Sequence, residues 1–193
     1  MILKVRRLVL SEQDKFIKRV GAGLFGAIHI PLVVRLSKKL LLTHPEADKN
    51  ITILGAWLHD SGHLWGGKGN YPDKIDHAVT GEIKAKEILR DFGADSRTIE
   101  KVSHIVRSHR NRDIAPKTIE AKIVAAADSG AHFYGNTYDN ILKHSKGNLK
   151  QKAGYALDKL ERDWRDVSVF PELAEKLKEN YETIKQRLES ILN

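Results

Sequence analysis

An adjacent histidine and aspartate, His59 and Asp60, close an apolar run that covers residues 51–58. A segment this hydrophobic is expected to be buried, and a buried carboxylate without a partner is costly in free energy. A divalent cation would compensate that charge, because an imidazole nitrogen and a carboxylate oxygen can both ligate it. The pair therefore suggests a metal site, but a dipeptide is short enough to occur by chance and needs support from the rest of the chain.

Two further polar residues stand in apolar surroundings. Asp128 lies in the alanine-rich segment 121–130, so it repeats the problem posed by Asp60, and His29 is flanked by aliphatic residues on both sides. One metal ion held with His29 and His59 would satisfy both carboxylates together. Burial in the core or helix capping would instead require a separate partner for each carboxylate.

The order and spacing of His29, His59-Asp60 and Asp128 resemble the HD superfamily of metal-dependent phosphohydrolases, whose pattern is a His, then His-Asp, then a distant Asp. The resemblance covers about residues 20–135. It implies a helical fold in which these four residues are the metal ligands.

Further histidines match particular branches of that superfamily. His77 and His109 match the two extra histidines of the branch that binds a second metal, which includes diadenosine polyphosphate hydrolases and cyclic-dinucleotide phosphodiesterases. The segment 59–63 also looks like the opening of the deoxynucleotide triphosphohydrolase motif, in which the last His, here His63, faces substrate phosphate. The cyclic-dinucleotide branch usually has Lys at this position, so the chain departs from it there. His44, His132 and His144 show no pattern that assigns them a role.

The composition restricts the cofactor. The chain has no Cys, which excludes disulfides and cysteine-based zinc or iron–sulfur sites, so the ligands must be nitrogen and oxygen. Mixed His and carboxylate ligands favour Mn, Fe, Co, Ni or Zn over Mg, which prefers all-oxygen sites. We expect one or two divalent ions, with Asp60 suited to bridge them because a carboxylate has two ligating oxygens.

Basic residues give the chain a formal net charge of +8 and a pI near 9.6. They alternate with acidic residues and form no long block, which favours a solvated surface over a track for long nucleic acids. Local exceptions surround the expected site. Arg107, Arg110 and Arg112 flank His109, and Lys68 and Lys74 follow the His-Asp pair. A cationic rim of this kind would attract phosphorylated substrates, and Lys68, Arg107 or Arg110 would stabilise charge that develops during the reaction.

Two classes of function remain. The first is a phosphohydrolase that uses metal-activated water to cleave an ester or anhydride of a nucleotide or another small phosphorylated metabolite, with Asp60, His63, Lys68, Arg107 and Arg110 in the catalytic set. His63, Lys68, Lys74, Arg107 and Arg110 would bind the substrate. The alternative is a non-catalytic metal-dependent regulator or nucleic-acid-binding protein on the HD fold. A complete ligand set favours the enzyme.

Helical periodicity predicts an all-α, single-domain bundle of the HD type. The length and 41% hydrophobic content suit one domain over residues 1–193, with the motif core over about 20–135 and a C-terminal helical extension over about 136–193. A capping box at Ser11 and Asp14 predicts the start of the first helix. Residues 2–10, which precede it, could be extended. Further helices are expected over about 31–42, 46–63, 72–91 and 96–109, around Asp128, and over about 136–145, 151–166 and 171–192.

Two further expectations follow from these periodicities. On the helix over 96–109, His104 and His109 lie about 140° apart, so only His109 is expected to face the metal. In the last helix an apolar stripe would pack on its own domain or form a homodimer.

No segment has the apolar length to span a membrane, so we expect a cytoplasmic protein.

Overall fold

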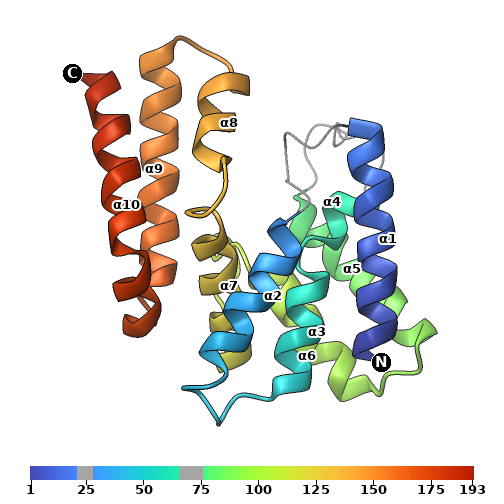
Figure 1. Ribbon diagram of the computed structural model, residues 1–193. Helices are drawn as coiled ribbons and strands as arrows, with labels where there is room; N and C mark the ends of the chain where they lie inside the picture. Colours follow the sequence, from blue (N-terminus) through green and yellow to red (C-terminus); the bar gives the residue numbers. More distant parts are fainter. Residues whose placement is uncertain (21–27, 66–75) are drawn as a thin grey trace.

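The computed structural model describes residues 1–20, 28–65 and 76–193 and is all-α, without strands in these ranges (Figure 1). This confirms the predicted fold class. The described helices are α1 (Ile2–Val20), α2 (His29–Leu40), α3 (Lys49–Leu58), α4 (Ser61–Trp65), α5 (His77–Asp91), α6 (Ser96–Ser108), α7 (Ile119–Ala131), α8 (Thr137–His144), α9 (Leu149–Val167) and α10 (Pro171–Leu192).

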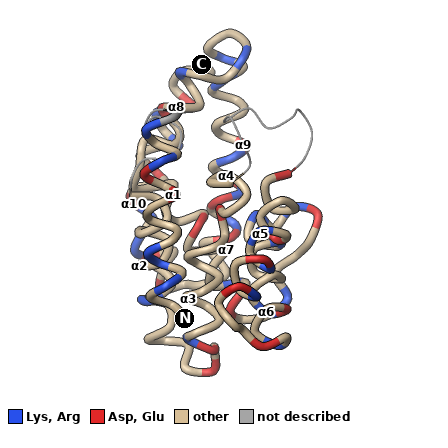
Figure 2. The backbone as a smooth tube through the Cα atoms, turned by 90° about the vertical axis from the view of Figure 1, so that its right-hand side faces the viewer, with Lys and Arg blue, Asp and Glu red and all other residues tan. Residues whose placement is uncertain are grey.

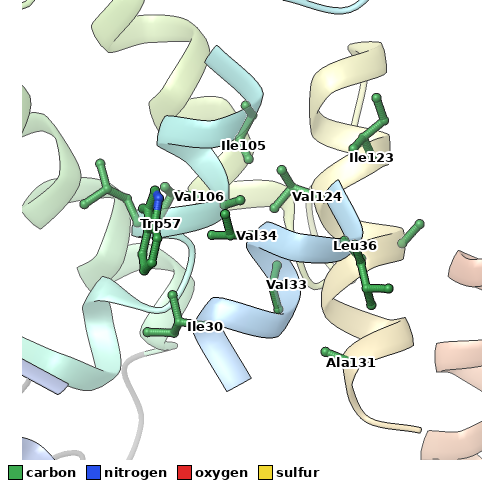
Figure 3. Packing of buried hydrophobic residues seen from close by; sticks show 14 of the residues in the cluster. Ile30, Val33, Val34, Leu36, Trp57, Ile105, Val106, Ile123, Val124 and Ala131 are labelled. Carbon is green, nitrogen blue, oxygen red and sulfur yellow. The ribbon is translucent and has the colours of Figure 1, made fainter. Parts of the chain in front are cut away.

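The centre of the fold is α3, which packs against α1, α2, α6 and α7. Every residue over 51–58 is buried, as the continuous apolar run requires. Figure 3 shows Val34 of α2, Trp57 of α3 and Val124 of α7 in this shared core. Because His59 and Asp60 directly follow α3, their side chains start from the most enclosed part of the molecule.

Aspartate caps fix the starts of several helices. The carboxylate of Asp76 accepts the backbone N–H of Ala78 at 2.9 Å, and that of Asp95 accepts the N–H of Thr98 at 2.9 Å. Each cap satisfies a backbone donor that the first helical turn leaves unpaired. The cap at Asp76 makes His77 the first residue of α5.

Three predicted boundaries were wrong. Helix α1 runs through Ser11, so the predicted capping box does not start it, and residues 2–10 are helical rather than extended. Val5, Val9 and Phe16 are buried at helical spacing, and packing of this face determines the conformation. The helix expected over residues 46–63 is broken at His59-Asp60 into α3 and α4. Helix α5 begins at His77 rather than at residue 72, which lies outside the described residues.

Within the C-terminal extension, α9 and α10 form a helical hairpin, and α9 packs against α7 and α8 (Figure 1). The rings of Trp164 and Tyr181 stack with centroids 4.3 Å apart, while Leu173, Leu177 and Leu188 of α10 are buried. Part of the apolar stripe of α10 therefore packs against other helices of the same chain. A homodimer through the remainder stays a prediction.

Charged residues are spread over the outside. Figure 2 shows Lys and Arg interspersed with Asp and Glu along the helices, as the sequence predicted. None of the described helices has both the length and the apolar character that crossing a membrane requires.

Candidate metal centre

Asp60 lies between two groups of histidines and presents one carboxylate oxygen to each. Its Oδ2 is 3.5 Å from Nε2 of His29 and 3.5 Å from Nε2 of His59. Its Oδ1 is 3.6 Å from Nε2 of His77 and 3.8 Å from Nε2 of His109. One buried carboxylate thus faces two separate sets of potential metal ligands.

Asp128 completes the first set. Its Oδ1 is 3.1 Å from Nε2 of His29 and 3.5 Å from Nε2 of His59, and these two nitrogens are 3.3 Å apart. Adjacent ligands bound at about 2.1 Å to one ion lie about 3.0 to 3.4 Å apart in octahedral or tetrahedral geometry. The observed separations fit that requirement. An ion here would join the start of α2, the end of α3 and the last turn of α7.

The second set consists of Asp60, His77 and His109, whose ligand atoms all lie within 4.8 Å of one another. Nε2 of His77 and Nε2 of His109 are 3.2 Å apart. His63 stands at the edge of this set: its Nε2 is 3.9 Å from Oδ1 of Asp60, and its ring stacks on that of His77 with centroids 3.8 Å apart. His104 points elsewhere, since its Nε2 accepts the backbone N–H of Lys117 at 3.0 Å.

Backbone carbonyls hold two of the histidines in the tautomer that metal ligation needs. Nδ1 of His59 donates to the carbonyl oxygen of Ala56 at 2.9 Å, and Nδ1 of His109 donates to that of Val106 at 2.7 Å. With the proton on Nδ1, the Nε2 lone pair is free and points into the centre. Each carbonyl lies three residues before its histidine, so the helix itself orients the ring.

The charge states of these groups also suit a cation. Burial opposes ionisation of Asp60, but His59 and the other nearby histidines outweigh it and hold the pKa of Asp60 well below its usual value. Burial lowers the pKa of His63 to about 4 and that of His77 to about 2. Burial also lowers the pKa of His109. Asp60 is therefore ionised at neutral pH, and His63, His77 and His109 are neutral, which are the ligating forms. His59 differs: burial opposes its charge, but Asp60 and Asp128 outweigh burial and hold its pKa well above the usual value. A cation bound at this position would take the place of the Nε2 proton of His59.

Gly62 allows α4 to approach α5 closely enough to bring His77 to Asp60. A Cβ at position 62 would lie 2.0 Å from the carbonyl oxygen of His77 and 2.7 Å from Oγ1 of Thr80. We expect Gly62→Ala to lower the free energy of unfolding by about 2 to 3 kcal/mol, because the backbone must shift to relieve the overlap. Urea denaturation measures this, and Gly154→Ala is the control, since no atom lies within 4 Å of its Cβ. Equal stabilities of the two variants would contradict the prediction.

His132 is a residue of this site that the sequence did not assign. Its Nδ1 donates to Oδ2 of Asp163 at 3.0 Å, and its Nε2 lies 3.9 Å from Oδ1 of Asp128. Asp163 is buried on α9 and also accepts hydrogen bonds from the Tyr138 hydroxyl at 2.8 Å and from Lys159 at 2.8 and 2.9 Å. The C-terminal extension therefore orients an imidazole beside the centre. Its signal in the sequence was only the one-turn spacing from Asp128 to His132.

The predicted cationic residues divide into three groups. Arg110 and Arg112 line the cavity at the centre, and Arg110 pairs with Asp76. Arg107 is not among the described residues that line it, and its guanidinium pairs with Asp113. The third group, Lys68 and Lys74, lies outside the described residues.

A cavity of about 790 Å³ opens onto the centre. This volume falls within the range of about 300 to 1,000 Å³ typical of small-ligand pockets. His29, Asp60, His63, His77, His109 and Asp128 contribute to one part of its wall. Another part comes from the loop after α6, the segment between α7 and α8, and helices α8 and α9. It includes Arg112, Tyr134, Tyr155 and Arg162.

Comparison with known proteins agrees with this geometry. Residues 26–130 match the family model of the HD domain, which is more than half of the chain and contains both sets of potential ligands. No curated protein and no solved structure matched the chain. The fold, the family match and the grouped histidines and aspartates agree, and the chain belongs to the HD-domain family of the metal-dependent phosphohydrolase superfamily.

Proposed function

We propose that this protein is a phosphohydrolase with a two-metal centre that cleaves an ester or anhydride of a small phosphorylated substrate. The observation that carries the proposal is the position of Asp60, whose two oxygens face two separate histidine sets. His29, His59, Asp60 and Asp128 would hold one ion, and Asp60, His77 and His109 the other. A carboxylate shared in this way fits paired ions that act on the two sides of one phosphoryl group.

When bound, divalent cations would activate a water molecule for attack and polarise the phosphoryl oxygen. The chain's own residues would position the substrate around them. His63 is neutral at pH 7 and lines the cavity beside Asp60, so its N–H can donate a hydrogen bond to a phosphoryl oxygen. Arg110 adds a positive charge to the same wall, where it would stabilise charge on the phosphate.

A nucleotide is the substrate class that the cavity supports best. Tyr134, which follows α7, and Tyr155 of α9 are exposed and line the cavity, so either ring can stack on a base. The interspersed charges in Figure 2 support a small substrate over a long nucleic acid, which would need an extended basic track. The mixed His and carboxylate ligands support Mn, Fe, Co, Ni or Zn as the native metal.

His109→Gln is expected to lower the metal stoichiometry from about two ions to about one, because it removes an Nε2 ligand from the second set only. Elemental analysis of the purified protein measures the change. The matched control is His104→Gln, on the same helix, whose imidazole contacts Lys117 instead. Loss of one ion in both variants, or in neither, would contradict the assignment of His109.

The test of the function is a substrate panel after metal analysis. Protein loaded in turn with each candidate metal would be incubated with phosphomonoesters, nucleotides, cyclic dinucleotides and dinucleoside polyphosphates. We expect metal-dependent release of phosphate, nucleotide or both from at least one of the nucleotide substrates. Tight nucleic-acid binding at physiological salt, with no turnover on the panel, would support the non-catalytic alternative instead.

A further inference from the structure

Three arginines on the cavity wall, Arg112, Arg162 and Arg165, form no ion pair with a described carboxylate, unlike Arg110 on the same wall. Arg112 follows α6 and Arg162 lies on α9, and both line the cavity that opens onto the metal centre. Among the described residues, no ion pair involves either guanidinium, whereas Arg107 pairs with Asp113 and Arg110 with Asp76. Their positive charges are therefore available to a ligand in the cavity.

Asn111 and Asp166 fix the loop that carries Arg112 onto α9. Asn111 has a positive φ of 47°, which turns the chain sharply after α6, and its Nδ2 donates to Oδ1 of Asp166 at 2.8 Å. Oδ2 of Asp166 accepts a hydrogen bond from Oγ of Ser129 on α7 at 3.0 Å. A half-buried carboxylate thus joins the loop, α7 and α9, and it holds Arg112 and Arg162 on the same part of the wall.

The arrangement brings positive charges together. Arg112 is exposed, but partial desolvation lowers its pKa, and the charges of Arg110 and Arg162 lower it further. Guanidinium groups near one another repel. A multiply charged anion bound between them attracts each group and offsets this repulsion. Planar guanidinium groups suit phosphate oxygens, to which they can donate paired hydrogen bonds.

We propose that Arg112 and Arg162 bind a second phosphoryl group of the substrate while the first occupies the metal centre. The preferred substrate would then carry at least two linked phosphates, as in a nucleoside diphosphate, a nucleoside triphosphate or a dinucleoside polyphosphate. This inference rests on the proposed function, and it assigns selectivity to the C-terminal extension, because Arg162 lies beyond the residues that match the family.

Binding of non-hydrolysable probes tests the subsite without turnover. Methylenediphosphonate and methylphosphonate differ by one phosphonate group, and calorimetry at a constant free metal concentration would give the affinity of the metal-loaded protein for each. We expect the diphosphonate to bind more tightly. Arg162→Gln should weaken its binding about tenfold, since a charge-assisted hydrogen bond is lost, and methylphosphonate binding less than about twofold.

Three further variants complete the experiment. Arg97→Gln is the control, because Arg97 is an exposed arginine on α6 that does not line the described cavity. Arg162→Lys keeps the charge and should retain part of the diphosphonate affinity. Asn111→Gly permits the same positive φ but removes the hydrogen bond to Asp166, so it should weaken diphosphonate binding selectively.

The results distinguish a failure of the proposed phosphate subsite from a failure of the proposed phosphohydrolase function. Equal diphosphonate affinities for Arg162→Gln and Arg97→Gln would overturn the subsite, as would a wild-type protein that binds both probes equally. If the selective loss occurs but no phosphorylated compound is hydrolysed, the subsite stands and the proposed function fails. If hydrolysis occurs without the selective loss, only the subsite fails.

Discussion

Asp60→Asn is expected to remove metal from both positions and to lower phosphohydrolase turnover by about 10³-fold or more. The substitution keeps the size of the side chain but removes the negative charge that faces both histidine sets. A neutral amide cannot balance two divalent ions, and each ion would lose a ligand shared with the other. Elemental analysis and an assay with the best substrate of the panel measure the two effects.

A matched control for that variant is Asp95→Asn. Asp95 is exposed and caps α6, and asparagine is also a good capping residue, so metal content and turnover should stay at wild-type levels. Folding of Asp60→Asn would be checked by circular dichroism. A folded Asp60→Asn protein with two ions and full turnover would contradict the shared-carboxylate assignment.

Asp163→Leu is expected to lower the free energy of unfolding by about 3 to 5 kcal/mol. Asp163 is buried and accepts hydrogen bonds from His132, Tyr138 and Lys159. Leucine would leave these donors in a low-dielectric site without an acceptor, and the unpaired lysine charge would be the largest cost. Urea denaturation of the metal-free protein measures the change without a contribution from lost metal binding.

The control for Asp163→Leu lies on the same helix. Asp158 is exposed, so Asp158→Leu should change stability by less than about 0.5 kcal/mol. Asp163→Asn should fall between the two, because an amide oxygen can still accept one or two of the hydrogen bonds. Similar stabilities for Asp163→Leu and Asp158→Leu would show that the network contributes little.

The sequence predicted the residues of the centre because their polarity conflicts with their surroundings. Asp60 and Asp128 are charges in aliphatic segments, and the structure places both beside His29 and His59. Helical periodicity separated His109 from His104, and the structure places only His109 beside Asp60. In each case the information lies in a short stretch of the chain: an apolar run for the two aspartates, and residue spacing along one helix for the two histidines.

The parts that the sequence did not predict depend on contacts between distant helices. Asp163 lies on an amphipathic helix rich in charged residues, so nothing local distinguishes it from a solvated aspartate, and its partner His132 is on another helix. The pairing of Arg107 with Asp113 could not be foreseen either, because it depends on the turn after α6. The conformation of residues 2–10 stayed open because their β-branched and charged residues suit a strand as well as a helix.

Anomalous diffraction at the absorption edge of the bound metal tests the central claim most directly. We predict two anomalous peaks: one within bonding distance of His29, His59, Asp60 and Asp128, and one within bonding distance of Asp60, His77 and His109. The carboxylate of Asp60 should contact both ions, one through each oxygen. A single peak, with the imidazoles of His77 and His109 remote from it, would contradict the two-metal centre.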